Sequence, residues 1–235
     1  MAILIGDASS PPAGAQPTSN RFLAAIKEDS WLKLRPHLRS LQLPAGRTLL
    51  HSGDGITTAY FPTTAVLSAM EVLNDGQAVE AATIGDETGC CLTEVRSRSA
   101  ASALVVVQMA GHAFTLPASR LRACATADLS FTSLLDRHCQ CALLKARRKV
   151  ACVSFHSASA RLAAWILDMS LRVQSSRVVI TQEAVARCLG LQRTTVTAAA
   201  AQLQTTGAVR CRRGSIEILS SSILRGVACE CAGRP

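Results

Sequence analysis

The residues of this sequence with the clearest chemical potential are arginines and short polar side chains near its C-terminal end. Residues 181–204 read TQEAVARCLGLQRTTVTAAAAQLQ, with apolar residues at helical spacing on both sides of Gly190. This spacing predicts two helices joined by a tight turn, because glycine tolerates positive φ and close backbone approach. The side chains expected to point outward from the second helix are Gln192, Arg193, Thr194, Thr195 and Thr197. They offer donors and acceptors suited to the base edges of DNA.

A hairpin with three arginines is predicted directly after these helices. Residues 208–219 alternate around Arg213 and Gly214, which indicates two short strands. The guanidinium groups of Arg210, Arg212 and Arg213 are suited to phosphate oxygens. Thr181 is a natural N-cap, and the helix start at Thr181 and Gln182 would offer backbone amides to a phosphate. This part of the chain therefore predicts a DNA-binding unit with a recognition helix and a wing.

Thiols are the second chemical feature of the sequence. Ten cysteines in a long chain without a secretion signal are expected to be reduced and to pack as small apolar side chains. They form no paired Cys-x-x-Cys set and no histidine stands at ligand spacing from them, so we expect no metal site. Cys229 and Cys231 are the one candidate pair for redox chemistry. No Ser-His-Asp or Cys-His pattern indicates a catalytic nucleophile, so we do not expect an enzyme.

Positive charge is concentrated in the C-terminal half of the chain. Residues 136–235 contain 15 Lys and Arg against 5 Asp and Glu, whereas residues 1–135 contain 10 against 11. The two parts therefore carry +10 and −1, which together make the net charge of +9. This asymmetry indicates a polyanion as partner of the C-terminal half. A membrane surface is not the expected partner, because the sequence lacks a basic amphipathic helix with aromatic anchors.

The rest of the sequence predicts the elements that position this unit. Helical periodicity at residues 22–38, with Asp29 and Ser30 as expected caps, precedes short segments separated by turn signals. These segments, between residues 41 and 117, indicate antiparallel strands in a sandwich or barrel. Helical periodicity returns at residues 118–127 and in a long helix that Asp128 is expected to cap. The predicted fold class is therefore α+β, with an antiparallel N-terminal β-domain, a long helix and a C-terminal helix-turn-helix.

No segment resembles a secretion signal or a membrane anchor. Residues 1–19 lack a charged start followed by an apolar core and contain three prolines, so we expect a flexible tail. The uncharged run from Ser99 to Ser119 is interrupted by polar residues, glycine and proline and is rich in β-branched residues, which favours buried strands. We therefore expect a cytoplasmic protein.

The turn glycine, the alanine four residues before it and the arginine-bearing hairpin at 181–219 resemble the winged helix-turn-helix of the Crp/Fnr superfamily of bacterial transcription regulators. The predicted strands are similarly spaced to the jelly-roll-like β-roll sensor of that superfamily, so the resemblance covers nearly all of the chain beyond residue 20. It implies a β-roll with flanking helices at 20–127, a dimerisation helix at 128–156 and a DNA-binding domain at 157–235. It also implies a homodimer that binds double-stranded DNA and contacts RNA polymerase.

The resemblance further implies a cyclic nucleotide bound by a Gly-Glu-x-Gly run and an Arg-Ser pair, with the glutamate accepting from ribose and the arginine binding phosphate. The matching residues are Glu87, Gly89, Arg98 and Ser99. Asp86 replaces the first glycine, and its carboxylate would repel a phosphate. A cyclic nucleotide, another ligand or redox state, and no ligand at all therefore stay open. An iron–sulfur cluster is not supported, because members that carry one have cysteines near the N-terminus and the first here is Cys90.

The long helix carries a heptad stripe of apolar and small side chains, interrupted at Lys149, that is expected to pack against a second copy of the chain. Its members are Leu135, Cys139, Ala142, Ala146 and Val153. The same stripe could instead belong to the core of one chain. A dimer would place two recognition helices in successive major grooves, so the expected target is an inverted repeat. Arg193 is the residue expected to contact a guanine.

Two other functions fit parts of the sequence. In one, Cys229 and Cys231 carry out redox chemistry and the basic half binds acidic partners. In the other, the chain is a dimeric scaffold whose wing no longer binds DNA. Specific retention of DNA fragments would distinguish a regulator from both.

Overall fold

The computed structural model describes residues 19–231, so the predicted tail lies outside the described residues apart from Ser19. The chain divides into two compact units. The first comprises residues up to Met70 and residues 83–142, and the second comprises residues 71–82 and the chain from Leu143 onward. The division falls within the long helix rather than at either of its ends.

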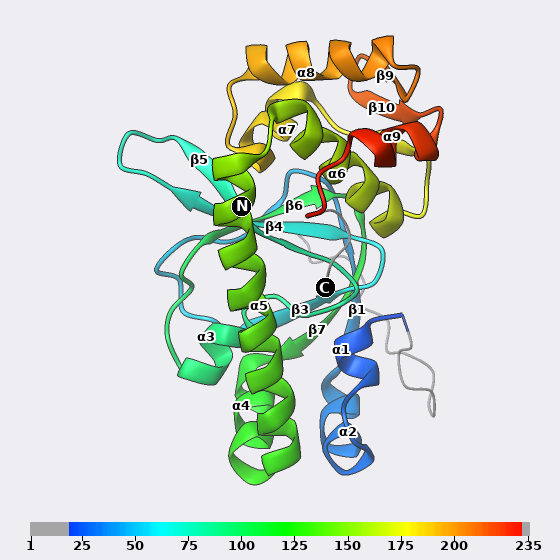
Figure 1. Ribbon diagram of the computed structural model, residues 1–235. Coiled ribbons are helices and arrows are strands. Elements are labelled where there is room, and N and C mark those ends of the chain that lie inside the picture. The colour runs from blue at the N-terminus through cyan, green and yellow to red at the C-terminus, as the bar shows by residue number, and fades with distance from the viewer. Residues whose placement is uncertain (1–18, 232–235) are drawn as a thin grey trace, which may run out of the picture. The chain divides into compact units, whose positions relative to one another are not determined.

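Antiparallel strands form the framework of the first unit. They make a three-stranded sheet in the order β1-β7-β3 and a four-stranded sheet in the order β2-β6-β4-β5, the latter reaching into the 71–82 segment (Figure 1). The strands are β1 (Arg39–Leu43), β2 (Thr48–Leu50), β3 (Thr58–Pro62), β4 (Val66–Val72), β5 (Ala78–Ile84), β6 (Leu104–Met109) and β7 (Gly111–Pro117). The prediction of antiparallel strands is confirmed, and the uncharged run forms β6 and β7.

Alternating burial along the strands explains the core of this unit. In β6, Val105, Val107 and Met109 are buried while the residues between them are partly exposed, as expected for a strand with one face inward. Phe22 stacks on Phe61 with ring centroids 5.6 Å apart and meets Phe131 edge-on at 6.3 Å. The first pair joins a helix to a β-sheet, and the second joins two helices.

Short helices precede the strands, and their caps differ from the prediction. The helices are α1 (Arg21–Ala24), α2 (Glu28–Leu34) and the 3₁₀ helix η1 (Arg35–His37). Asn20 caps α1 by accepting from the Leu23 amide at 3.1 Å. The assignment of Asp29 and Ser30 as caps is wrong, because α2 begins one residue before Asp29. Ser30 is buried within α2 instead, and its hydroxyl donates to Asp128 Oδ2 at 2.6 Å.

The later helices of the first unit follow the sequence closely. They are α3 (Leu92–Ser97), α4 (Ala118–Ala127) and α5 (Leu129–Phe155), of which α5 continues into the second unit. Asp128 lies at the start of α5 and accepts from the Ser130 amide at 2.8 Å, as expected for a cap. Leu135 was expected on a dimer seam, but it is fully buried in the core of its own chain. The face of the first turns of α5 that carries Leu135 packs into the core of this unit, so it exposes no seam at that position.

The second unit holds the helix-turn-helix and a small sheet. Its elements are α6 (Ala158–Arg172), β8 (Arg177–Val179), α7 (Gln182–Leu189), α8 (Arg193–Thr205), β9 (Val209–Arg212), β10 (Ser215–Ile218) and α9 (Ser221–Val227). Ser157 caps α6 by accepting from the Ala160 amide, and one face of α6 supplies buried Leu162, Ile166 and Met169. The sheet has the order β8-β10-β9 (Figure 1). None of the helices between residues 19 and 231 is long and apolar enough to cross a membrane.

Candidate nucleic-acid interface

The turn between α7 and α8 has the geometry that the sequence predicted. The Thr181 hydroxyl accepts from the Ala184 amide at 3.2 Å and caps α7. Gly190 ends α7 with φ of +60°, a left-handed conformation that favours glycine. The chain then needs only two residues before α8 begins at Arg193. The two helices are therefore fixed at a sharp angle by a glycine turn.

One face of α8 is buried and the other is open to solvent. The buried residues are Val196, Ala199, Ala200 and Leu203, as the apolar spacing predicted. Gln192, Arg193, Thr194 and Thr197 are exposed, and Thr195 is half-buried. Gln182, at the start of α7, hydrogen-bonds to Thr197. The polar face of α8 and the first residue of α7 therefore form one continuous surface.

The arginine-bearing hairpin forms as predicted by β9 and β10, with Gly214 at its tip at φ of +74°. Arg210 lies opposite Glu217 in the register, and its Nη1 is 3.5 Å from Glu217 Oε2. Arg212 and Arg213 are exposed next to the tip. The carboxylate of Glu217 offsets part of the charge of Arg210, so Arg212 and Arg213 keep more of their charge for an anion.

Arg161 is a residue of this unit that the sequence analysis missed. Its side chain is buried in α6, and its Nη2 donates to the Leu189 carbonyl at the end of α7. The last carbonyls of a helix lack partners within the helix, so a guanidinium there stabilises its end. The sequence signal that could have indicated this role is a single arginine among the apolar residues of a predicted helix. Arg161 is buried and positions the turn.

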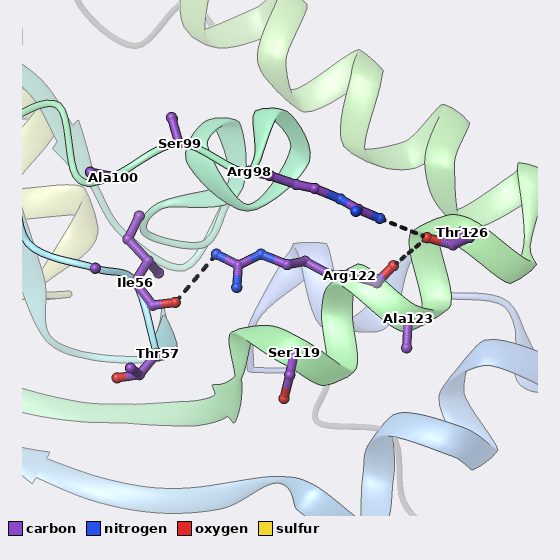
Figure 2. A pocket seen from close by; sticks show the side chains of 10 residues that line it. Ile56, Thr57, Arg98, Ser99, Ala100, Ser119, Arg122, Ala123 and Thr126 are labelled. Atoms are coloured by element: carbon purple, nitrogen blue, oxygen red, sulfur yellow. Dashed lines mark hydrogen bonds between the residues drawn. The ribbon is translucent and has the colours of Figure 1, made fainter.

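A pocket of about 680 Å³ lies in the first unit, next to two of the four predicted effector residues. Figure 2 shows Arg98 extending toward Thr126 of α4 and Arg122 pointing toward Ile56. Arg98 Nη2 donates to Thr126 Oγ1 at 3.4 Å, and Arg122 Nη2 donates to the Ile56 carbonyl at 3.3 Å. Arg122 Nε is buried without a hydrogen-bond partner, so the pocket contains unused donor capacity.

Glu87 and Gly89 do not line this pocket, whereas Arg98 and Ser99 do. Gly89 packs against the ring of Phe61, where an added Cβ would come within 2.6 Å of the ring. Its glycine is therefore explained by packing in the core. The four predicted residues are therefore not brought together around this pocket.

The predicted dimer residues of α5 differ in exposure. Ala142, Ala146 and Val153 are exposed, and Cys139 is half-buried. Leu143 and Val150, which the predicted stripe did not include, are 53% and 69% exposed. Lys149, which interrupted the predicted stripe, forms an ion pair with Glu80, with Nζ 3.5 Å from the Glu80 carboxylate. Its charge is therefore paired within the chain.

All ten cysteines are free thiols. Cys229 and Cys231 lie beside Cys152 and His156, with Cys152 Sγ 3.7 Å from Cys229 Sγ. Burial, together with the neighbouring thiols, raises the pKa of Cys152 to about 12. A thiol in this state is a poor nucleophile at neutral pH.

The glycine turn, the polar face of α8 and the arginine-bearing hairpin define a winged helix-turn-helix, a class of DNA-binding protein. Residues 160–226 match the sequence profile described as the Crp-like helix-turn-helix domain. The chain therefore carries a Crp-like helix-turn-helix domain, preceded by an antiparallel β-domain. This match does not favour the alternative of a cysteine-based redox protein. No curated protein sequence matches the chain at a significant level.

Solved structures share this fold at low sequence identity. A transcriptional regulator of the Crp/Fnr family from Eubacterium rectale has a TM-score of 0.71 and 17% identity, over 89% of this chain and 98% of that one. FixK2 from Bradyrhizobium japonicum has a TM-score of 0.70 and 17% identity, over 82% and 98%. CLP, a c-di-GMP responsive global regulator from Xanthomonas campestris, has a TM-score of 0.66 and 14% identity, over 83% and 100%. These similarities establish the fold.

Proposed function

We propose that this chain is a Crp/Fnr-type transcription regulator that binds a specific DNA sequence as a homodimer on an inverted repeat, in the cytoplasm, and acts on RNA polymerase. The exposed polar face of α8 carries the proposal. A helix with a buried apolar side and an arginine at its exposed N-terminus is suited to enter a major groove with its first turn against the bases. The wing arginines would then lie on the phosphate backbone.

Arg193 is the proposed guanine contact, because it is exposed in the first turn of α8 and its fork can bind the O6 and N7 atoms together. In the superfamily this helix often carries an acidic residue and a second arginine, whereas Thr194 and Ala198 stand at the matching positions. We therefore expect a half-site that differs from the usual one.

The test is selection of bound sequences from a random DNA library, followed by gel-shift measurements at two salt concentrations. We expect an inverted repeat with half-sites about one helical turn apart. Arg193→Ala should cost about 1 to 3 kcal/mol at one base position. Arg120→Ala, which removes an exposed arginine from the other unit, is the matched control and should leave affinity unchanged. Enrichment of no common sequence would refute specific recognition.

The exposed stripe of α5 is the observation that supports the proposed homodimer. Leu143, Ala146, Val150 and Val153 follow the alternating three- and four-residue spacing of a coiled-coil seam, and all four are exposed. A second copy presents the same stripe, so the two helices can bury these side chains against each other around a two-fold axis. We propose this register in place of Leu135 and Ala142.

Two neighbouring leucines provide the test of this register. The two leucines are similarly exposed, Leu143 at 53% and Leu144 at 45%, but only Leu143 lies on the stripe. Leu143→Glu should convert the dimer to a monomer in sedimentation equilibrium, because the charge would be buried in the seam. Leu144→Glu should remain dimeric. A wild-type monomer, or equal effects of both substitutions, would contradict the proposal.

The pocket at Arg98 and Arg122 is the proposed effector site. Two guanidinium groups, with the hydroxyl groups of Ser99, Ser119 and Thr126, suit a small ligand that carries a phosphate or carboxylate. Calorimetric titration with cyclic AMP, inorganic phosphate and citrate should detect binding of at least one anion. Arg122→Met should weaken that binding, whereas Arg39→Met, an exposed arginine outside the pocket, should not. Equal binding by the Arg122→Met variant would contradict this site.

A further inference from the structure

Four potential metal ligands lie close together in the second unit. They come from two segments that are far apart in the sequence. Cys152 lies near the end of α5 and His156 directly follows that helix, while Cys229 and Cys231 follow α9. Their three sulfur atoms and one imidazole nitrogen all lie within 4.8 Å of one another. Cys152 Sγ is 3.7 Å from Cys229 Sγ, and Cys231 Sγ is 3.7 Å from His156 Nδ1.

These distances match the coordination shell of a single tetrahedral ion. With zinc–sulfur bonds of about 2.3 Å, neighbouring ligand atoms of a tetrahedron are about 3.8 Å apart. The Cys152–Cys229 and Cys231–His156 pairs already stand close to that separation, and all four atoms lie within 4.8 Å of one another. An iron–sulfur cluster holds its thiolates further apart because several iron atoms lie between them, so the compact set suits one ion.

The imidazole is oriented by a second contact. His156 Nε2 lies 3.2 Å from Glu230 Oε2 and donates to this carboxylate when it carries the proton. The lone pair is then on Nδ1, the atom that faces Cys231. Metal-bound histidines commonly donate their other nitrogen to a carboxylate in this way, which fixes the tautomer and the ring.

The geometry points to a structural Zn²⁺ site formed by Cys152, His156, Cys229 and Cys231, with Glu230 as the positioning residue for His156. Three thiolates and one imidazole are a closed Cys₃His set, which leaves no open position for a substrate. Thiolate ligands favour Zn²⁺ over Mg²⁺ or Ca²⁺, which prefer oxygen.

The site would fasten the C-terminal segment to the joint between α5 and α6. Cys229 is buried, and its amide donates to the Ala160 carbonyl at 3.3 Å in the first turn of α6. The ion would therefore hold residues 229–231, the end of α5 and the start of α6 together. This joint leads from the proposed dimer helix into the helix-turn-helix, but metal binding can be measured without DNA and so stands apart from the proposed function.

The test uses the full chain purified under reducing conditions, with zinc measured by elemental analysis. We expect about one Zn²⁺ per chain. After exchange for Co²⁺, we expect the strong visible absorption of a tetrahedral site and a thiolate-to-cobalt charge-transfer band. Cys152→Ser and Cys231→Ser should each lose the stoichiometric ion. Cys141→Ser changes an exposed thiol of the same α5 outside the cluster and should keep it.

Two further variants separate a ligand from a residue that only supports the fold. His156→Cys should still bind Co²⁺, with a stronger charge-transfer band because a fourth thiolate replaces the imidazole. Glu230→Ala should weaken Zn²⁺ about ten- to a hundredfold without changing the ligand set. The proposal is overturned if the wild-type chain takes up neither Zn²⁺ nor Co²⁺ stoichiometrically, if it holds iron instead, or if Cys141→Ser loses metal as Cys231→Ser does.

Discussion

The Thr197 hydroxyl donates to Gln182 Oε1 at 2.8 Å, which joins the exposed face of α8 to the first residue of α7. Thr197 Oγ1 also lies 3.0 Å from the Arg193 carbonyl, one helical turn earlier. Both side chains were predicted to contact DNA. In the free protein they are hydrogen-bonded to each other. We infer that this contact fixes the orientation of Gln182 before DNA binds.

A double-mutant cycle can measure this contact. Thr197→Val and Gln182→Ala should each lower the free energy of unfolding, and the two losses should not add. The coupling should be about 0.5 to 1.5 kcal/mol, the usual contribution of one hydrogen bond. Urea unfolding without DNA provides the measurement. Additive losses would show that the contact contributes nothing in solution.

The wing should contribute affinity that depends on salt and little on sequence. Replacing Arg212 and Arg213 together by alanine should reduce the slope of log affinity against log salt concentration by about two, because each lost phosphate contact releases one counterion fewer. The preferred DNA sequence should stay the same. Arg225→Ala removes an exposed arginine of α9 and serves as control. An unchanged slope in the double variant would argue against phosphate contact by the wing.

Arg161→Met should destabilise the second unit. The substitution keeps most of the side-chain volume but leaves the Leu189 carbonyl without the guanidinium that now donates to it. The expected loss is about 1 to 3 kcal/mol in thermal or urea unfolding. Arg225→Met, at an exposed position, should change stability by less than about 0.5 kcal/mol. Equal stability of the two variants would mean that the Arg161 contact is not formed in solution.

Asp128 should make stability depend on pH in the acid range. Hydrogen bonds from Ser30 and Ser130 lower the pKa of this carboxyl from 3.8 to about 2. A group with a depressed folded-state pKa stabilises the protein above its unfolded pKa, and this contribution is lost as pH falls through the folded value. Asp128→Asn should therefore flatten the fall in melting temperature between pH 3.8 and about pH 2. An identical pH profile in this variant would contradict the assigned hydrogen bonds.

Much of the fold could be predicted from local patterns. The glycine turn, the two faces of α8, the arginine hairpin and α4 follow from periodicity and from residues that permit only certain backbone conformations. Such features depend on residues that are close together in the chain, so they can be predicted from a single sequence. The caps at Asp29 and Ser30 failed because a buried serine in a helix and an N-cap serine look alike in sequence.

The sequence by itself determined that the C-terminal part is a basic winged helix-turn-helix preceded by antiparallel strands and a long helix. Only the tertiary structure decided which side chains of that helix stay exposed, because Leu135 is covered by its own core while Leu143 and Val150 are not. It also brought Cys152 and His156 to Cys229 and Cys231, which no spacing rule connects. Contacts between distant segments depend on the packing of the whole unit, so they cannot be predicted from local periodicity.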